Sequence, residues 1–412
     1  MNQRKIGTLP LCCLMIGAVL GSGIIILPPL AIEAAGDWAI IGWGATTLFG
    51  IAFAYLFAKI GTLFPGDGGA ANAVERAFGP SAKLLASATL SCAVLFGPAA
   101  VILTIIQYLP PGVAPESPVD RALLAAVIQI SCAILVVSGL KNMSHFTMLL
   151  ASTATILLLT GAGLTLFFHS APPAPLPPVN TSAMGYTMLL LFWAVVGWEV
   201  VGNFGAEVVN PRRTVPRAAV IAALIIGLVS MAVAAGLQYG HIPAEAGHGV
   251  ASLLFPLFGT LSPWVMAGLT TALCVTTYLM IIGAVSRLVA HLSQETGLPD
   301  ILNRRNRFGV PWVVVLGYTI VHLFQFFLIA LGILDLAMIV AIADGFFLAN
   351  ALLGTLAAVR LFTSPLPRAV ATVLCIGVFL VFLQSHWQVL AAIGCMALLL
   401  TYRARRRTIF AR

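Results

Sequence analysis

The chain has 412 residues, of which 60% are hydrophobic and only 8% are charged, and its mean hydropathy is +1.04. Soluble domains carry about 25% charged residues, so this chain has too few charges to cover a soluble surface. The composition excludes a soluble enzyme, a coiled coil and a disordered protein. It predicts an all-α polytopic membrane protein. The net charge of +8 indicates no nucleic-acid partner, because the basic residues lie in short segments between apolar runs.

Apolar runs along the chain predict the membrane spans, since a crossing helix needs about 20 apolar residues. The first run is too long for a cleavable leader, so we expect it to remain as the first span. We place twelve spans near residues 8–34, 38–62, 82–109, 119–140, 144–169, 183–206, 216–239, 260–290, 311–331, 335–360, 367–384 and 386–403.

The basic residues test this count. If the N-terminus is cytoplasmic, 20 of the 21 lysines and arginines fall in inner segments and only Arg121 falls outside. Cytoplasmic loops carry such an excess of Lys and Arg, and a missed span would scramble the alternation. The pattern predicts twelve spans in a cell (inner) membrane, with both termini cytoplasmic.

The first span contains a glycine-rich interruption, Gly21-Ser22-Gly23, with Pro28-Pro29 after it. Glycine lowers the cost of leaving helical geometry. A second half-helix that starts here would present free N–H groups and the positive end of its dipole, which suit a carboxylate. The alternative is close packing of helices through small residues.

The sixth span has similar features, because Gly197, Glu199, Gly202 and Asn203 interrupt it after Trp193. The first and sixth spans are equivalent members of two five-span halves. Paired interrupted spans in two such halves indicate the binding site of a secondary transporter. We therefore expect two broken helices at one substrate site.

Three segments resemble the amino acid–polyamine–organocation superfamily: Gly21-Ser22-Gly23, residues 64–70 (FPGDGGA) and residues 207–217 (EVVNPRRTVPR). Chain length and residues 344–347 (DGFF) resemble most its bacterial exporters of neutral amino acids, the methionine and branched-chain type. The resemblance implies a LeuT-type fold, a 5+5 inverted repeat with broken helices 1 and 6 plus two extra helices. A single domain, 1–412, would contain repeats 8–169 and 183–360 and the added spans 367–403.

The resemblance also implies which residues bind the substrate. Donors at the first break would hold its carboxylate, and the carbonyls before the break would face its α-amino group. The sixth span would add carbonyls and an aromatic gate, Trp193. The matching residues are Val19, Leu20, Gly21, Ser22, Gly23, Trp193, Val196, Gly197 and Ile282. Ile282 lies where arginine antiporters of the family have an aromatic residue, and Pro98 lies near one of their polar positions. Both differences argue against a cationic substrate.

Two acids fall inside predicted spans, Glu199 and Asp344. A charged side chain at membrane depth is costly, so such residues usually face a cavity and have a function. Glu199 is a candidate for proton coupling or for bonding the broken backbone. Asp344 is a candidate for coupling, for bonding a helix break or for lining the inner vestibule.

The function that fits best is proton-coupled export of small neutral, mostly apolar L-amino acids by alternating access. The partners would be the substrate, protons and the lipid bilayer, and the chain would act as a monomer or homodimer. An amino-acid/amine exchanger without net ion coupling is the alternative within this class, and a transporter-like channel or sensor is the alternative outside it. We expect no enzyme activity, metal or cofactor, since no nucleophile–base pair or metal cluster is visible.

Overall fold

The computed structural model describes residues 7–64, 69–110, 112–138, 143–169, 176–198, 209–240, 248–296 and 299–410. Within these residues the regular elements are helices, as the composition predicts. In the described part of the chain, eight helical stretches are long and apolar enough to span a membrane, and three shorter apolar helices accompany them. The chain is therefore an all-α, multi-pass membrane protein.

Each range predicted as a span contains helix among its described residues. In chain order the α-helices are α1 (Thr8–Leu20), α2 (Gly23–Ala35), α3 (Ala39–Leu63), α4 (Gly69–Phe78), α5 (Pro80–Val94), α6 (Gly97–Gln107), α7 (Pro118–Val137), α8 (Met143–His169), α9 (Thr181–Leu191), α10 (Pro211–Tyr239), α11 (Phe255–Phe258), α12 (Ser262–Thr296), α13 (Trp312–Ala330), α14 (Leu336–Leu361), α15 (Pro365–Phe382) and α16 (Trp387–Phe410). Short 3-10 turns include η2 (Phe192–Val195) and η5 (Gly249–Leu254). The division into two inverted repeats stays a prediction.

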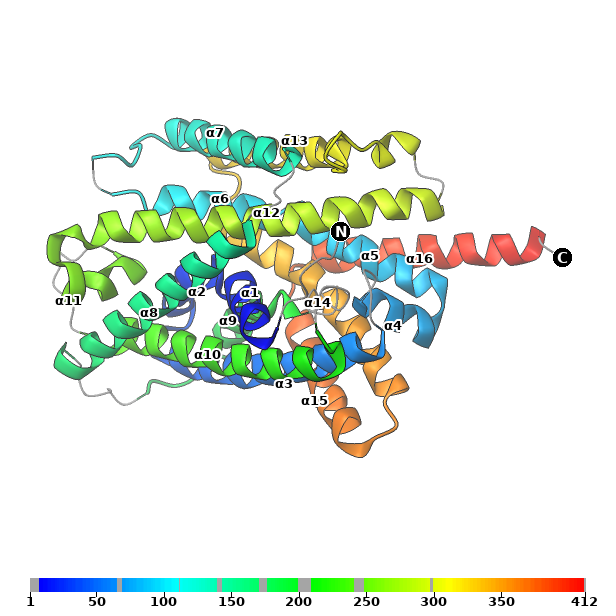
Figure 1. The fold of residues 1–412 in the computed structure, drawn as a ribbon, viewed down its shortest axis with the longest axis horizontal. Helices are drawn as coiled ribbons and strands as arrows, with labels where there is room; N and C mark the ends of the chain where they lie inside the picture. Colours follow the sequence, from blue (N-terminus) through cyan, green and yellow to red (C-terminus); the bar gives the residue numbers. More distant parts are fainter. Residues whose placement is uncertain are drawn as a thin grey trace.

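The helices form layers around a central group (Figure 1). Helices α7 and α13 pack together along one side, and α3 and α10 pack together along the opposite side. Between them lie α1, α2, α9 and α14, with α12 beside α6. The short helices α1, α2 and α9 are therefore enclosed by longer ones.

The first predicted span is broken, as its glycines indicate. Helix α1 ends at Leu20 and α2 begins at Gly23. Gly21 has φ +29°, in a region that favours glycine. Pro28 and Pro29 lie inside α2 and remove two N–H donors. Gly21-Ser22-Gly23 thus breaks the helix, and close packing through small residues alone does not account for these glycines.

The third predicted span, 82–109, is also broken, which we did not anticipate. Helix α5 ends at Val94 and α6 begins at Gly97, followed by Pro98. The N–H groups of Leu95 and Phe96 donate to the carbonyls three residues earlier in the chain, those of Cys92 and Ala93. This pattern is the tightening expected where a proline stops the helical ladder.

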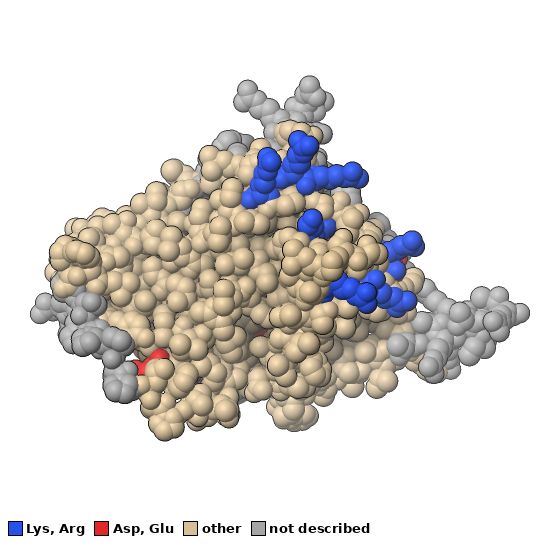
Figure 2. Space-filling model, turned by 90° about the horizontal axis from the view of Figure 1, so that it is seen from below, with Lys and Arg blue, Asp and Glu red and all other residues tan. Residues whose placement is uncertain are grey.

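Basic side chains gather toward one end of the molecule. Figure 2 shows lysines and arginines near the right-hand end of this face, and Figure 1 places the C-terminus at that end. The rest of the visible face carries few charges. On this face, one end of the long axis is therefore rich in basic side chains and the opposite end is not.

Candidate functional site

The break between α1 and α2 presents backbone donors. The Ser22 carbonyl accepts from the N–H groups of Ile25 and Ile26, at 3.1 and 3.0 Å. The N–H groups of Gly23 and Ile24 precede the first intrahelical bond and have no acceptor within α2. The Ser22 hydroxyl is buried, the residue being 1% exposed, and bonds no described residue. Such an arrangement suits an anionic group.

The sixth span changes conformation where the glycines predict. Helix α9 ends at Leu191 and continues as the 3-10 turn η2. Val196 is extended, its N–H donates to the Trp193 carbonyl at 3.2 Å, and Gly197 has φ +115°. One lone pair of the Trp193 carbonyl is therefore used by the turn. Glu199, the proton-coupling candidate on this span, lies outside the described residues.

The Trp193 indole is the point where the breaks meet. It is only 6% exposed. A methyl group added at Gly23 would lie 3.1 Å from Trp193 Cδ1, and one added at Gly97 would lie 2.9 Å from Trp193 Cη2. The Phe347 ring of α14 meets the indole edge-on, with centroids 6.0 Å apart and planes at 87°. Breaks in the first, third and sixth spans thus converge on one aromatic side chain.

Asp344 of α14 lies next to this indole residue. It is fully buried, at 0% exposure. The backbone N–H of Trp193 is the donor that faces its carboxyl group, yet neither oxygen makes a hydrogen bond of ordinary geometry with a described residue. A buried acid without a full set of partners is costly in a membrane protein, so Asp344 stays a candidate functional residue.

The remaining predicted site residues differ in how closely they join this cluster. Val19 and Leu20 are buried at the end of α1, directly before the break. Ile282 is fully buried on α12, a helix that packs against α1 and α6. The structure thus brings Gly23, Trp193 and Asp344 into one cluster and leaves the role of Ile282 as a prediction.

Tyr108, directly after α6, joins α2 to η5. Its hydroxyl donates to the Ile25 carbonyl at 3.0 Å and accepts from the Val250 N–H of η5 at 3.3 Å. His248 stacks on the Tyr108 ring, with centroids 5.6 Å apart, and hydrogen-bonds the Gln107 carbonyl at 3.0 Å. Hydrogen bonds through Tyr108 therefore hold the segment 248–254 next to α2.

These contacts were not predicted, because neither Tyr108 nor Gln129 stands out in the sequence as a site residue. Gln129 is in fact fully buried in α7. Its amide bonds both Tyr278 and His322. The available signal was the spacing of Tyr318, His322 and Gln325, which places three polar side chains on one face of an apolar helix.

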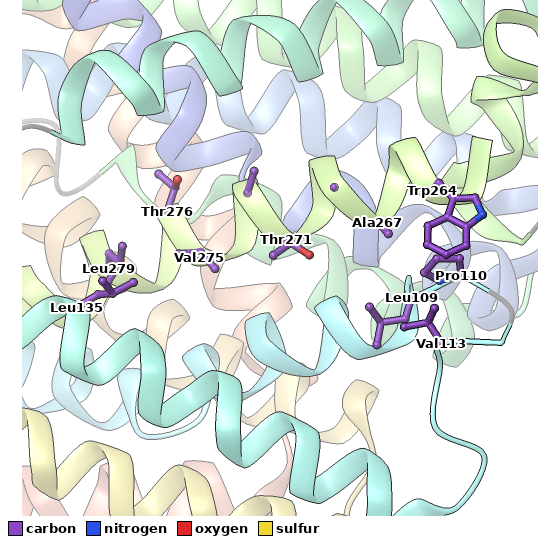
Figure 3. A pocket seen from close by; sticks show the side chains of 12 residues that line it. Leu109, Pro110, Val113, Leu135, Trp264, Ala267, Thr271, Val275, Thr276 and Leu279 are labelled. Atoms are coloured by element: carbon purple, nitrogen blue, oxygen red, sulfur yellow. The ribbon is translucent and has the colours of Figure 1, made fainter. Parts of the chain in front are cut away.

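A separate groove of about 620 Å³ lies beside α12 (Figure 3). Its walls are almost entirely apolar, and they come from α12, the segment that follows α6 and Leu135 of α7. Trp264 and Val113 stand at one end of it, and both are exposed on the outside of the bundle. None of the predicted substrate residues lines this groove, so it is distinct from the helix breaks.

Comparison with known proteins agrees with this architecture. Residues 6–400 match the family model described as amino acid permease. Over 324 residues the chain is 26% identical to the putrescine transporter PotE of Escherichia coli, covering 75% of this chain and 72% of that protein. It is 25% identical over 329 residues to the cadaverine/lysine antiporter of Escherichia coli, with 75% and 71% covered. It is 24% identical over 300 residues to the uncharacterized amino acid permease YecA of Bacillus subtilis, with 72% and 70% covered. The broken helices, the apolar spans and these matches together show that the chain belongs to the amino acid permease family, within the amino acid–polyamine–organocation superfamily.

Proposed function

We propose that this protein is a secondary transporter of small neutral, mostly apolar L-amino acids. The observation that carries the proposal is the start of α2, where free backbone donors and the buried, unpartnered Ser22 hydroxyl meet the Trp193 indole. The donors suit the carboxylate that all amino acids share. The indole and Phe347 offer an apolar surface to the substrate side chain.

Alternating access follows from the same arrangement. Broken helices let half-helices tilt around a fixed site while the long helices hold the frame. The bonds from Tyr108 to Ile25 and Val250 close one end, which supports a state closed at the end away from the basic residues. The basic end is then cytoplasmic, as the positive-inside pattern predicts, in a bacterial-type inner membrane.

Coupling would use a carboxyl group that changes protonation during the cycle. Asp344 is the acid that the structure places beside Trp193, and Glu199 is the candidate on the sixth span itself. Their protonation would link export to the proton gradient. The LeuT-type topology with twelve spans is part of this proposal.

A second candidate is exchange of an amino acid for an amine. Two of the relatives are named for putrescine and for cadaverine and lysine, which are cations. The specific observation in its favour is Asp344, since an unpartnered carboxylate beside an indole can receive an ammonium group.

One competition experiment separates the two. Purified protein in proteoliposomes is given labelled leucine, and unlabelled methionine, alanine, lysine, putrescine and cadaverine are added as competitors. We expect methionine to compete and the three cations to fail, because a cationic side chain loses hydration against an apolar wall. Strong competition by putrescine or lysine would replace the first proposal by the second.

A further inference from the structure

Three polar side chains of α13 bond to backbone carbonyls at the C-terminal end of α5: Tyr318, His322 and Gln325. They are spaced four and three residues apart, so they share one helix face. Their bonds run from the Tyr318 hydroxyl to the Ser91 carbonyl at 3.2 Å, from His322 Nε2 to the Val94 carbonyl at 3.0 Å, and from Gln325 Nε2 to the Leu95 carbonyl at 2.6 Å.

The chemistry of Pro98 explains why these carbonyls need partners. In a continuous helix the Val94 carbonyl would accept from the N–H of residue 98, which proline lacks. The Leu95 carbonyl would accept from Ala99, whose N–H bonds the Phe96 carbonyl at 3.0 Å instead. His322 and Gln325 therefore replace the bonds that the break removes.

His322 is held in one orientation from three further helices. Because Nε2 faces a carbonyl, it carries the hydrogen, and Nδ1 then accepts from the Gln129 amide at 2.9 Å. The same amide nitrogen donates to the Tyr278 hydroxyl at 2.7 Å. His322 and Gln129 are both 0% exposed. The break in the third span is thus fixed by α7, α12 and α13.

The break in turn places the start of α6 at the candidate substrate site. A methyl group on Gly97 would lie 2.9 Å from Trp193 Cη2 and 3.8 Å from Phe347 Cε2. A continuous helix through residues 94–98 would displace this backbone relative to the indole. The position of Gly97 therefore sets how much room remains beside Trp193.

We propose that the Pro98 break fixes the size of the substrate's side-chain pocket, and that His322 is the positioning residue that holds this break. The inference rests on the proposed function and adds a selectivity determinant to it. His322 touches no substrate, since it acts through the Val94 carbonyl and the start of α6.

The test compares four variants. His322→Leu removes the donor to Val94, and His322→Gln supplies an amide N–H at similar reach. Pro98→Ala restores the missing backbone donor and permits a continuous helix. Pro98→Ala combined with His322→Leu lets the Val94 carbonyl bond within its own helix. Ile320→Val, at an exposed position of the same helix, is the control.

Two quantities are measured. The first is the melting temperature of the purified protein, and the second is the ratio of the concentrations of unlabelled alanine and unlabelled leucine that halve the uptake of labelled leucine. We expect His322→Leu to be destabilised, and His322→Gln and the control to keep both the melting temperature and the ratio. Pro98→Ala alone should be less stable than wild type, because the buried His322 N–H loses its acceptor, and the double variant should be more stable than His322→Leu. In both Pro98→Ala and the double variant the ratio should change about tenfold, the size expected for altered fit in an apolar pocket.

An unchanged ratio in folded Pro98→Ala and in the double variant would overturn the inference and reduce His322 to a structural cap. Failure of His322→Leu to fold does not remove the test, because the double variant retains a partner for Val94. If the wild type takes up no amino acid, the proposed function falls and this inference with it. Uptake by the wild type with an unaltered ratio in the variants overturns the inference alone.

Discussion

The Ile25 carbonyl accepts its hydrogen bond from the Tyr108 hydroxyl, at 3.0 Å, because the residue four positions further along α2 is Pro29. In an ordinary helix the N–H of residue 29 would occupy that carbonyl, and proline has none. The proline therefore creates an acceptor inside α2 that a side chain from the end of α6 can use. One hydroxyl then joins α2 to η5, since it also accepts from Val250.

Tyr108→Phe should loosen this closed end. The change leaves the buried Ile25 carbonyl without its donor, which costs about 1–3 kcal/mol. We expect a lower melting temperature and faster hydrogen–deuterium exchange in the peptides that cover α2 and η5. Tyr186→Phe is the control, because that hydroxyl makes no hydrogen bond that the structure shows with a described residue. Equal exchange in both variants would show that the closure does not depend on Tyr108.

Gly249→Ala should disturb the same contact for a different reason. Gly249 has φ +55°, and an added methyl group would lie 2.6 Å from the Tyr108 hydroxyl. Backbone strain of this kind costs about 1–3 kcal/mol, and the steric clash adds to it. Combining Gly249→Ala with Tyr108→Phe removes the clash and keeps the strain. The fall in melting temperature of the double variant should therefore be smaller than the sum of the falls in the two single variants.

Gly23→Val should abolish tight substrate binding. The new side chain begins 3.1 Å from Trp193 Cδ1, so the indole must move or the helix start must shift. Either change separates the backbone donors from the ligand, and we expect affinity to fall by more than about tenfold, the factor for about 1.4 kcal/mol. Gly163→Val in α8 is the control, because that position is exposed and has no atom within 4 Å of an added methyl group. Wild-type affinity in a folded Gly23→Val protein would remove this helix start from the site.

Asp344→Asn should remove the response of net transport to an imposed pH gradient. Asparagine keeps the shape and hydrogen bonds, but it cannot change protonation. Substrate-for-substrate exchange should survive better than net flux. The measurement is uptake into proteoliposomes with and without the gradient, with Glu199→Gln tested in parallel. If only Glu199→Gln loses the response, the coupling group is Glu199 and Asp344 has a structural role.

The two expected helix breaks could be predicted because their causes are local. Gly21 and Gly197 adopt positive φ angles that other residues rarely take, so glycine at mid-span is a direct signal. The polar residues Ser22 and Asp344 stood out for a similar reason, since each lies in an apolar run.

The third break and the closed end could not be predicted, because their causes are not local. Pro98 is a single proline in an apolar run, and prolines are tolerated in membrane helices when neighbours supply the missing bonds. The neighbour that supplies one is His322, which is 228 residues away from Val94 in the chain. The partner of Tyr108 in η5 is likewise 142 residues away. A single sequence gives no indication that such distant residues meet.

The pairing of Pro98 with His322 has a consequence for the divergence of this family. A helix without proline at position 98 supplies its own donor to residue 94, and a polar side chain at position 322 then lacks its acceptor. Each substitution alone leaves a buried group at the break unpaired, whereas both together leave neither the Val94 carbonyl nor the side chain at position 322 without a partner there. The two positions should therefore change together among relatives, and an alignment deep enough to test co-variation would show proline at one accompanied by a hydrogen-bond donor at the other.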